Sequence, residues 1–154
     1  MSVQVRWIAP DNGGSAITAY QILIQKSDGS FSSQLTDCDG TSSTIVVSRS
    51  CNIPISTLIV APFNLLWGDD VYATVTAVNV YGSSTVSLAG NGAKILREPD
   101  APVNLANDPS ITSGSQIGLT WAQGIENGGT PVIDFTISYK FGTTDYAILA
   151  SGIT

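Results

Sequence analysis

A segment near the start of the chain returns near its end. Trp7 is followed by Asn12-Gly13-Gly14, and the same order recurs as Trp121 followed by Asn127-Gly128-Gly129. The tryptophans lie 114 positions apart and the Asn-Gly-Gly segments 115 apart, so the second copy carries one inserted residue. This period is longer than that of solenoid repeats, which is about 20 to 50 residues. The chain is therefore expected to fold as two copies of one module in tandem.

Short stretches in which apolar and polar residues alternate run through the whole chain. Examples are residues 3–7, 20–24 and 71–77. Alternation with a period of two places one face of a β-strand in a core. The stretches are separated by Asp-Gly and Asn-Gly pairs, which are typical of turns, and no long stretch has helical periodicity. The sequence predicts an all-β fold.

Two prolines, Pro99 and Pro102, mark the boundary between the copies. Proline fixes φ and removes a backbone donor, so the pair predicts a short, stiff, extended connector. We expect a first domain over residues 1–97 and a second over residues 98–154. The first is expected to lack its opening strand and the second to be the N-terminal part of its module, which would leave unpaired strand edges.

Five short segments stand in the order found in one known family. Trp7, the Asn12–Ser15 loop and the Ile17–Ile22 segment follow one another, then come Val75–Ser84 and Pro99–Leu105. In this order and spacing they resemble the end of strand B, the loop after it, strand C, strand F and the next strand A of tandem fibronectin type III domains. The resemblance covers nearly the whole chain. It implies immunoglobulin-like β-sandwiches, the second one incomplete.

The chain also departs from that family. Val71 stands where the family usually has a tyrosine that ties down the corner before strand F. The link over residues 53–67 is longer and more apolar than usual. Cys38 and Cys51 lie before and around strand E, which excludes the disulfide that joins the two sheets of immunoglobulin domains. No Arg-Gly-Asp tripeptide occurs, so integrin adhesion by that route is not implied.

Four aromatic residues are the predicted structural core of the two copies. Trp7 and Trp121 are equivalent by the repeat, and each is expected to pack under the strand that follows it. The expected contacts are with Tyr20 in the first copy and Phe135 in the second. Because burial of an indole ring removes a large apolar surface from water, these contacts are expected to stabilise both copies.

The two cysteines, Cys38 and Cys51, have two interpretations. They are either buried thiols of a cytosolic protein or a disulfide across a local hairpin of an exported β domain. Zinc is not expected, because two thiols without histidine supply at most half of a tetrahedral ligand set. Asp37 and Asp39 weakly resemble a calcium loop, and an ordinary turn is the favoured interpretation because no bidentate glutamate follows.

Composition excludes several classes of function. The chain contains no histidine, which removes Ser-His-Asp and Cys-His sites and imidazole bases. Its only glutamates, Glu98 and Glu126, fall in connecting segments, so neither an enzyme nor a cofactor is expected. Trp67, Tyr72 and Tyr81 could form a sugar-stacking or protein-binding patch, but packing against loops or a neighbouring domain is the favoured interpretation.

Charge and hydropathy narrow the choice of partners. Six lysine and arginine residues stand against twelve aspartate and glutamate residues, a formal net charge of -6, and no two basic residues are adjacent. Nucleic acid is therefore not expected as a partner. No apolar run is long enough for a membrane span and no signal peptide is visible. The chain has no N-glycosylation sequon, while its many serines and threonines leave O-linked glycans open.

These features together predict a structural repeat of an extracellular or cell-surface filament or matrix protein. It would act by spacing and by association with protein partners, either neighbouring repeats of a longer chain or other subunits in a fibre. A ligand-binding ectodomain of a receptor or adhesin is one alternative. A spacer module of a secreted polysaccharide-degrading enzyme is another. Fold resemblance alone does not separate them.

Overall fold

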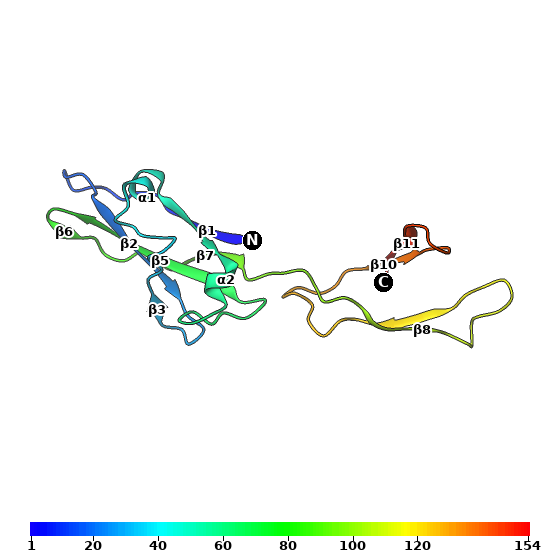
Figure 1. The fold of residues 1–154 in the computed structure, drawn as a ribbon. Helices are drawn as coiled ribbons and strands as arrows, with labels where there is room; N and C mark the ends of the chain where they lie inside the picture. Colours follow the sequence, from blue (N-terminus) through cyan, green and yellow to red (C-terminus); the bar gives the residue numbers. More distant parts are fainter. The chain divides into compact units, whose positions relative to one another are not determined.

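The computed structural model describes all 154 residues. They divide into two compact units, Met1–Leu96 (unit 1) and Arg97–Thr154 (unit 2). Strands predominate in both, and the only helices are the short α1 (Ser43–Ser48) and α2 (Ile55–Leu58) of unit 1 (Figure 1). The all-β class predicted from the alternating sequence is confirmed.

Unit 1 contains two antiparallel sheets. In the smaller sheet β1 (Ser2–Arg6) pairs with β4 (Ser50–Pro54), so that Val3 lies opposite Ile53. The larger sheet has the order β3–β2–β5–β6, and β7 also pairs with β5. Its strands are β2 (Ala19–Gln25), β3 (Phe31–Ser32), β5 (Asp70–Asn79), β6 (Gly82–Ser83) and β7 (Gly90–Lys94).

Both sheets contribute to one core. Alternate residues are buried along β1, β2 and β4, as expected of strands with one face turned inward. The buried residues that the strands supply to this cluster are Val3, Val5, Tyr20, Ile22, Ile24, Cys51, Ile53, Val71 and Ala77. Shared burial of this kind is the main force that holds two sheets together.

The apolar link between β4 and β5 completes the core. Its buried residues are Ile55 and Leu58 of α2, then Phe63 and Leu65. The Leu65 N–H donates to the Leu58 carbonyl at 3.0 Å, which closes the link into a loop. This burial explains why the link is longer and more apolar than a simple connection would need to be.

Unit 2 consists of two hairpin-like sheets. In one, β8 (Val103–Asn107) pairs with β9 (Leu119–Ala122), and in the other β10 (Phe135–Tyr139) pairs with β11 (Ala147–Ile153). None of the buried apolar residues belongs to this unit. Its cohesion therefore depends on backbone pairing more than on a core.

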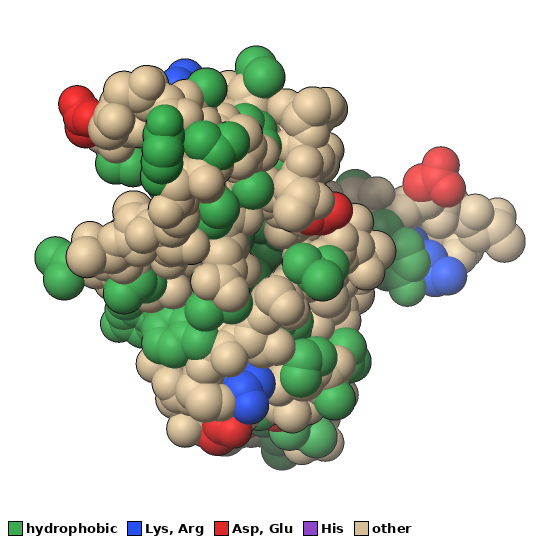
Figure 2. All heavy atoms as spheres, turned by 90° about the vertical axis from the view of Figure 1, so that its left-hand side faces the viewer, with side chains coloured by type: hydrophobic (Ala, Val, Ile, Leu, Met, Phe, Trp, Pro, Cys, Tyr) green, Lys and Arg blue, Asp and Glu red, His purple; other side chains and the backbone are tan.

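Charged side chains are sparse on the surface. They make up 12% of the sequence. On the face shown in Figure 2, apolar and uncharged polar groups predominate and only a few charged groups stand between them. Such a surface is weakly protected against association, because few like charges keep neighbouring molecules apart.

Candidate functional site

The structure brings together the aromatic pair predicted for each copy. The Trp7 and Tyr20 rings meet edge to face with centroids 5.1 Å apart, and Trp121 meets Phe135 at 5.6 Å with the same interplanar angle of 68°. Tyr20 is buried, whereas the other three rings are half-buried. The indole Nε1 of Trp7 is buried without a hydrogen-bond partner, which is an uncommon and costly state for a polar atom.

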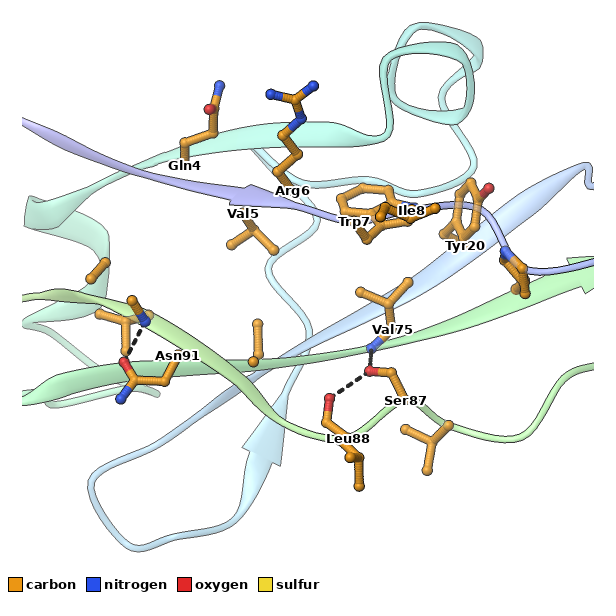
Figure 3. Close-up of a pocket in the computed structure, with 18 of the residues that line it drawn as sticks. Gln4, Val5, Arg6, Trp7, Ile8, Tyr20, Val75, Ser87, Leu88 and Asn91 are labelled. Atoms are coloured by element: carbon orange, nitrogen blue, oxygen red, sulfur yellow. Dashed lines mark hydrogen bonds between the residues drawn. The ribbon is translucent and has the colours of Figure 1, made fainter.

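A groove of about 670 Å³ runs beside β1. It is lined by β1 with Trp7 and Ile8, by β5, and by the chain over residues 84–88 and 90–93. Figure 3 shows Val5 of β1 and Val75 of β5 extending into it from opposite sides. The groove therefore lies between the two sheets, and its walls are largely apolar.

The backbone of β1 is available along this groove. Residues on β1 alternate in the direction of their N–H and C=O groups, and the Trp7 N–H donates to the Arg49 carbonyl beside β4 at 3.1 Å. The backbone N–H and C=O groups of Gln4 and Arg6 therefore point away from β4, toward the edge where no strand pairs with β1. Both residues line the groove although their side chains point away from it (Figure 3), as expected if their backbone borders it.

The opposite wall is held in place by serine hydroxyls. The Ser87 Oγ accepts a bond from the Val75 N–H at 3.0 Å and donates to the Leu88 carbonyl at 2.8 Å. Ser84 repeats this arrangement one step along β5, with the Ala77 N–H as its donor. These hydroxyls satisfy backbone groups of β5, so this part of β5 needs no further strand. On the other side of the groove, β4 is the only strand that pairs with β1.

Cys38 and Cys51 form a disulfide. They are 13 positions apart, and the segment between them holds α1 and not the local hairpin expected from its turn residues. Cys51 lies on β4, and both cysteines are buried. The disulfide thereby connects the smaller sheet to the segment that follows β3.

That segment runs tightly against β2. The Tyr20 N–H donates to the Gly40 carbonyl at 2.9 Å. A Cβ at Gly40 would overlap the Tyr20 carbonyl oxygen and approach the Ile22 Cδ1 to 2.7 Å. Only glycine permits this close approach, which covers an edge of β2 that would otherwise be open.

The carboxylates considered for calcium serve separate turns. The Asp39 Oδ1 accepts bonds from the Thr41 N–H at 3.0 Å and the Thr41 hydroxyl at 2.7 Å, and these bonds lower the pKa of Asp39. The Asp37 carboxylate accepts from the Gln34 side chain at 3.0 Å. No group of three or more acidic, cysteine or histidine side chains is placed to hold a metal ion.

The three other aromatic residues singled out in the sequence have different surroundings. Trp67 packs against the core of unit 1. Tyr72 lies half-buried on β5, and Tyr81 is exposed just after β5 ends. Of the groups predicted from the sequence, the aromatic pairs and the cysteines are thus the ones whose partners meet.

The groove wall was not predicted from the sequence. Its signal in the sequence is the run Ser83-Ser84-Thr85-Val86-Ser87, in which side-chain hydroxyls take the place of pairing with another strand.

Neither helix has the length and hydropathy needed to cross a membrane. No protein-family model matches the chain, and no curated protein is significantly similar to it.

Proposed function

We propose that the chain carries fibronectin type III-like modules of an extracellular or cell-surface structural protein. The strand pairing of unit 1 is the observation that supports this most. β1 and β4 correspond to strands B and E of one sheet, and β2, β5 and β7 to strands C, F and G of the other. The aromatic pair of unit 1, Trp7 with Tyr20, recurs in unit 2 as Trp121 with Phe135, which supports a second module of the same kind.

The proposed action is spacing and association, with no catalysis and no cofactor. A chain without histidine lacks the commonest general base and metal ligand. The Cys38–Cys51 disulfide favours an oxidising compartment. The low share of charged residues favours contact with protein neighbours, either adjacent repeats or other subunits.

Mass analysis of the native material tests this proposal. The proposal predicts a native polypeptide well above 16.0 kDa, with flanking peptides that repeat the tryptophan and Asn-Gly-Gly motif. Alkylation without reductant should leave both cysteines unmodified. A native chain of 16.0 kDa with two reactive thiols would contradict both the repeat architecture and the extracellular location.

A further inference from the structure

Asparagine is followed by glycine at three places in the chain, Asn12, Asn91 and Asn127. Such a pair can react with itself, because glycine has no Cβ to hinder the approach of its backbone nitrogen to the preceding carboxamide. Asn12 and Asn127 stand at the start of turns, whereas Asn91 lies within β7. The three side chains bind different backbone groups, so the three pairs are expected to differ in reactivity.

The Asn91 carboxamide is turned toward the nitrogen that would attack it. The Gly92 N–H donates to the Asn91 Oδ1 at 2.5 Å, and this bond is drawn as a dashed line in Figure 3. The carboxamide carbon Cγ is bonded directly to that oxygen, so it lies beside the same nitrogen. The side chain is therefore held close to the arrangement in which the two atoms react.

A β-bulge explains why this nitrogen binds a side chain. The register of β7 against β5 shifts between Val71 and Ala73, so that Asn91 and Gly92 together face Tyr72 and neither has a partner of its own in the ladder. A bulge interrupts the hydrogen bonds of the ladder at its unpaired residues. The Gly92 N–H thus binds the Asn91 side chain within its own strand.

The Asn12 side chain is held away from the nitrogen that would attack it. Its Oδ1 accepts from the Gly14 N–H at 2.9 Å, one residue beyond the attacking position. The Gly13 nitrogen, which would have to attack, donates to the Asp11 Oδ1 at 2.7 Å. Both hydrogen bonds must break before Asn12 can react.

Asn127 is held in a similar way in unit 2. Its Oδ1 accepts from the Gly129 N–H at 2.9 Å. Gly128, which carries the attacking nitrogen, is buried, and a Cβ there would overlap the Arg97 carbonyl oxygen. This packing limits the access of water to the Gly128 amide proton, which has to be removed for attack.

We propose that Asn91 is a site of spontaneous deamidation in the folded chain. The Gly92 nitrogen forms a bond to the Asn91 Cγ and closes a succinimide ring. The Cγ–Nδ2 bond breaks, and this nitrogen leaves as ammonia together with the Gly92 amide proton. Water then opens the ring at either of its two carbonyls, which leaves aspartate or isoaspartate and adds one negative charge. The reaction consumes water and needs no oxidant, reductant or cofactor.

The product changes the backbone at a place that is already irregular. Isoaspartate adds one carbon to the main chain of β7, inside the bulge opposite Tyr72. The pairing of Val71 with Ala93 beyond the bulge needs no change of register. The modified chain should therefore stay folded, and the modified fraction should increase with the age of the molecule.

Peptide mapping of the aged chain compares the three pairs within one sample. The oxidised full chain is kept at neutral pH, and trypsin, which cleaves after lysine and arginine, then places each Asn-Gly pair on a separate peptide. Each deamidation adds about 1 Da. The Asn91 peptide should be modified about tenfold faster than either of the others, because those must first lose hydrogen bonds. In urea with reductant, the three peptides should react at similar rates.

Two glutamine variants and an isoaspartate assay complete the test. Asn91→Gln should abolish modification of its peptide, because the longer side chain would have to close a larger ring. Asn12→Gln is the matched control and should leave the rate at Asn91 unchanged. A methyltransferase specific for isoaspartate should label the aged wild type and the aged control, and it should label aged Asn91→Gln at least about tenfold less.

Two results would overturn the inference. One is a folded chain in which Asn91 reacts no faster than Asn12 and Asn127. The other is aspartate without isoaspartate at position 91, which would indicate direct hydrolysis of the side chain without a ring. The reaction does not depend on the proposed function, so neither result bears on the mass of the native polypeptide or on its cysteines.

Discussion

Gly40→Ala is expected to destabilise unit 1 strongly, because the added methyl group has no space. It would overlap the Tyr20 carbonyl oxygen and approach Ile22 to 2.7 Å. The segment must move away from β2, which strains the packing by about 1–3 kcal/mol. The movement also breaks the bond from the Tyr20 N–H to the Gly40 carbonyl, a loss of about 0.5–1.5 kcal/mol. The free energy of unfolding should therefore fall by about 1.5–4.5 kcal/mol.

Urea unfolding of the oxidised full chain, followed by tryptophan fluorescence, measures this effect. The matched control is Gly90→Ala in the same unit, where the nearest atom to the new methyl group would be the Ala73 carbonyl oxygen at 3.9 Å. The control should change stability by less than about 0.5 kcal/mol. If the two variants unfold within about 1 kcal/mol of each other at equal m values, the segment is not clamped against β2 and the reasoning is refuted.

Three further predictions concern the aromatic pairs, the disulfide and one turn. Trp7→Ala should destabilise the chain by about 3 kcal/mol, whereas Trp121→Ala should cost less than about 1 kcal/mol because unit 2 buries no apolar side chain; urea unfolding compares them. Without reductant, the cysteine peptides should weigh two hydrogens less than after reduction, and reduction should lower the free energy of unfolding by about 3 kcal/mol. An NMR titration should place the pKa of Asp28 at about 2, below the usual 3.8, chiefly because the Ser30 hydroxyl and N–H bind the charged form. The resulting stabilisation is present above the usual value and lost as pH falls toward 2, and Ser30→Ala should raise the pKa.

Strands with one buried face could be predicted because their pattern is local. β1, β2 and β5 fall on the alternating stretches of the sequence. α1 could not be predicted, because Thr44, Ile45, Val46 and Val47 are β-branched and favour strands. Its helical turn is imposed by the surroundings, since it packs beside β4 within the span that the disulfide closes.

The candidate site was predictable only in part. The repeat predicted the aromatic pair of Trp7 and Tyr20 beside the groove, because Trp7 and Trp121 stand at the same point of the two copies. The opposite wall could not be predicted from the sequence. Ser84 and Ser87 hold it through hydrogen bonds between their hydroxyls and backbone N–H groups of β5, which lies earlier in the chain. Such bonds depend on which strands become neighbours, and local alternation carries no information about that.

The disulfide also conceals an aggregation hazard. The helix that it encloses, Ser43-Thr44-Ile45-Val46-Val47-Ser48, buries no residue and carries no charge. Four of its six residues are β-branched, and a six-residue segment of high β propensity without charge or proline is the signature of segments that stack into cross-β fibrils. Held as a helix between two fixed ends, the segment cannot extend to pair with copies of itself. A reducing environment removes that restraint, so loss of one covalent bond would turn this helical segment of unit 1 into a nucleus for amyloid-like assembly.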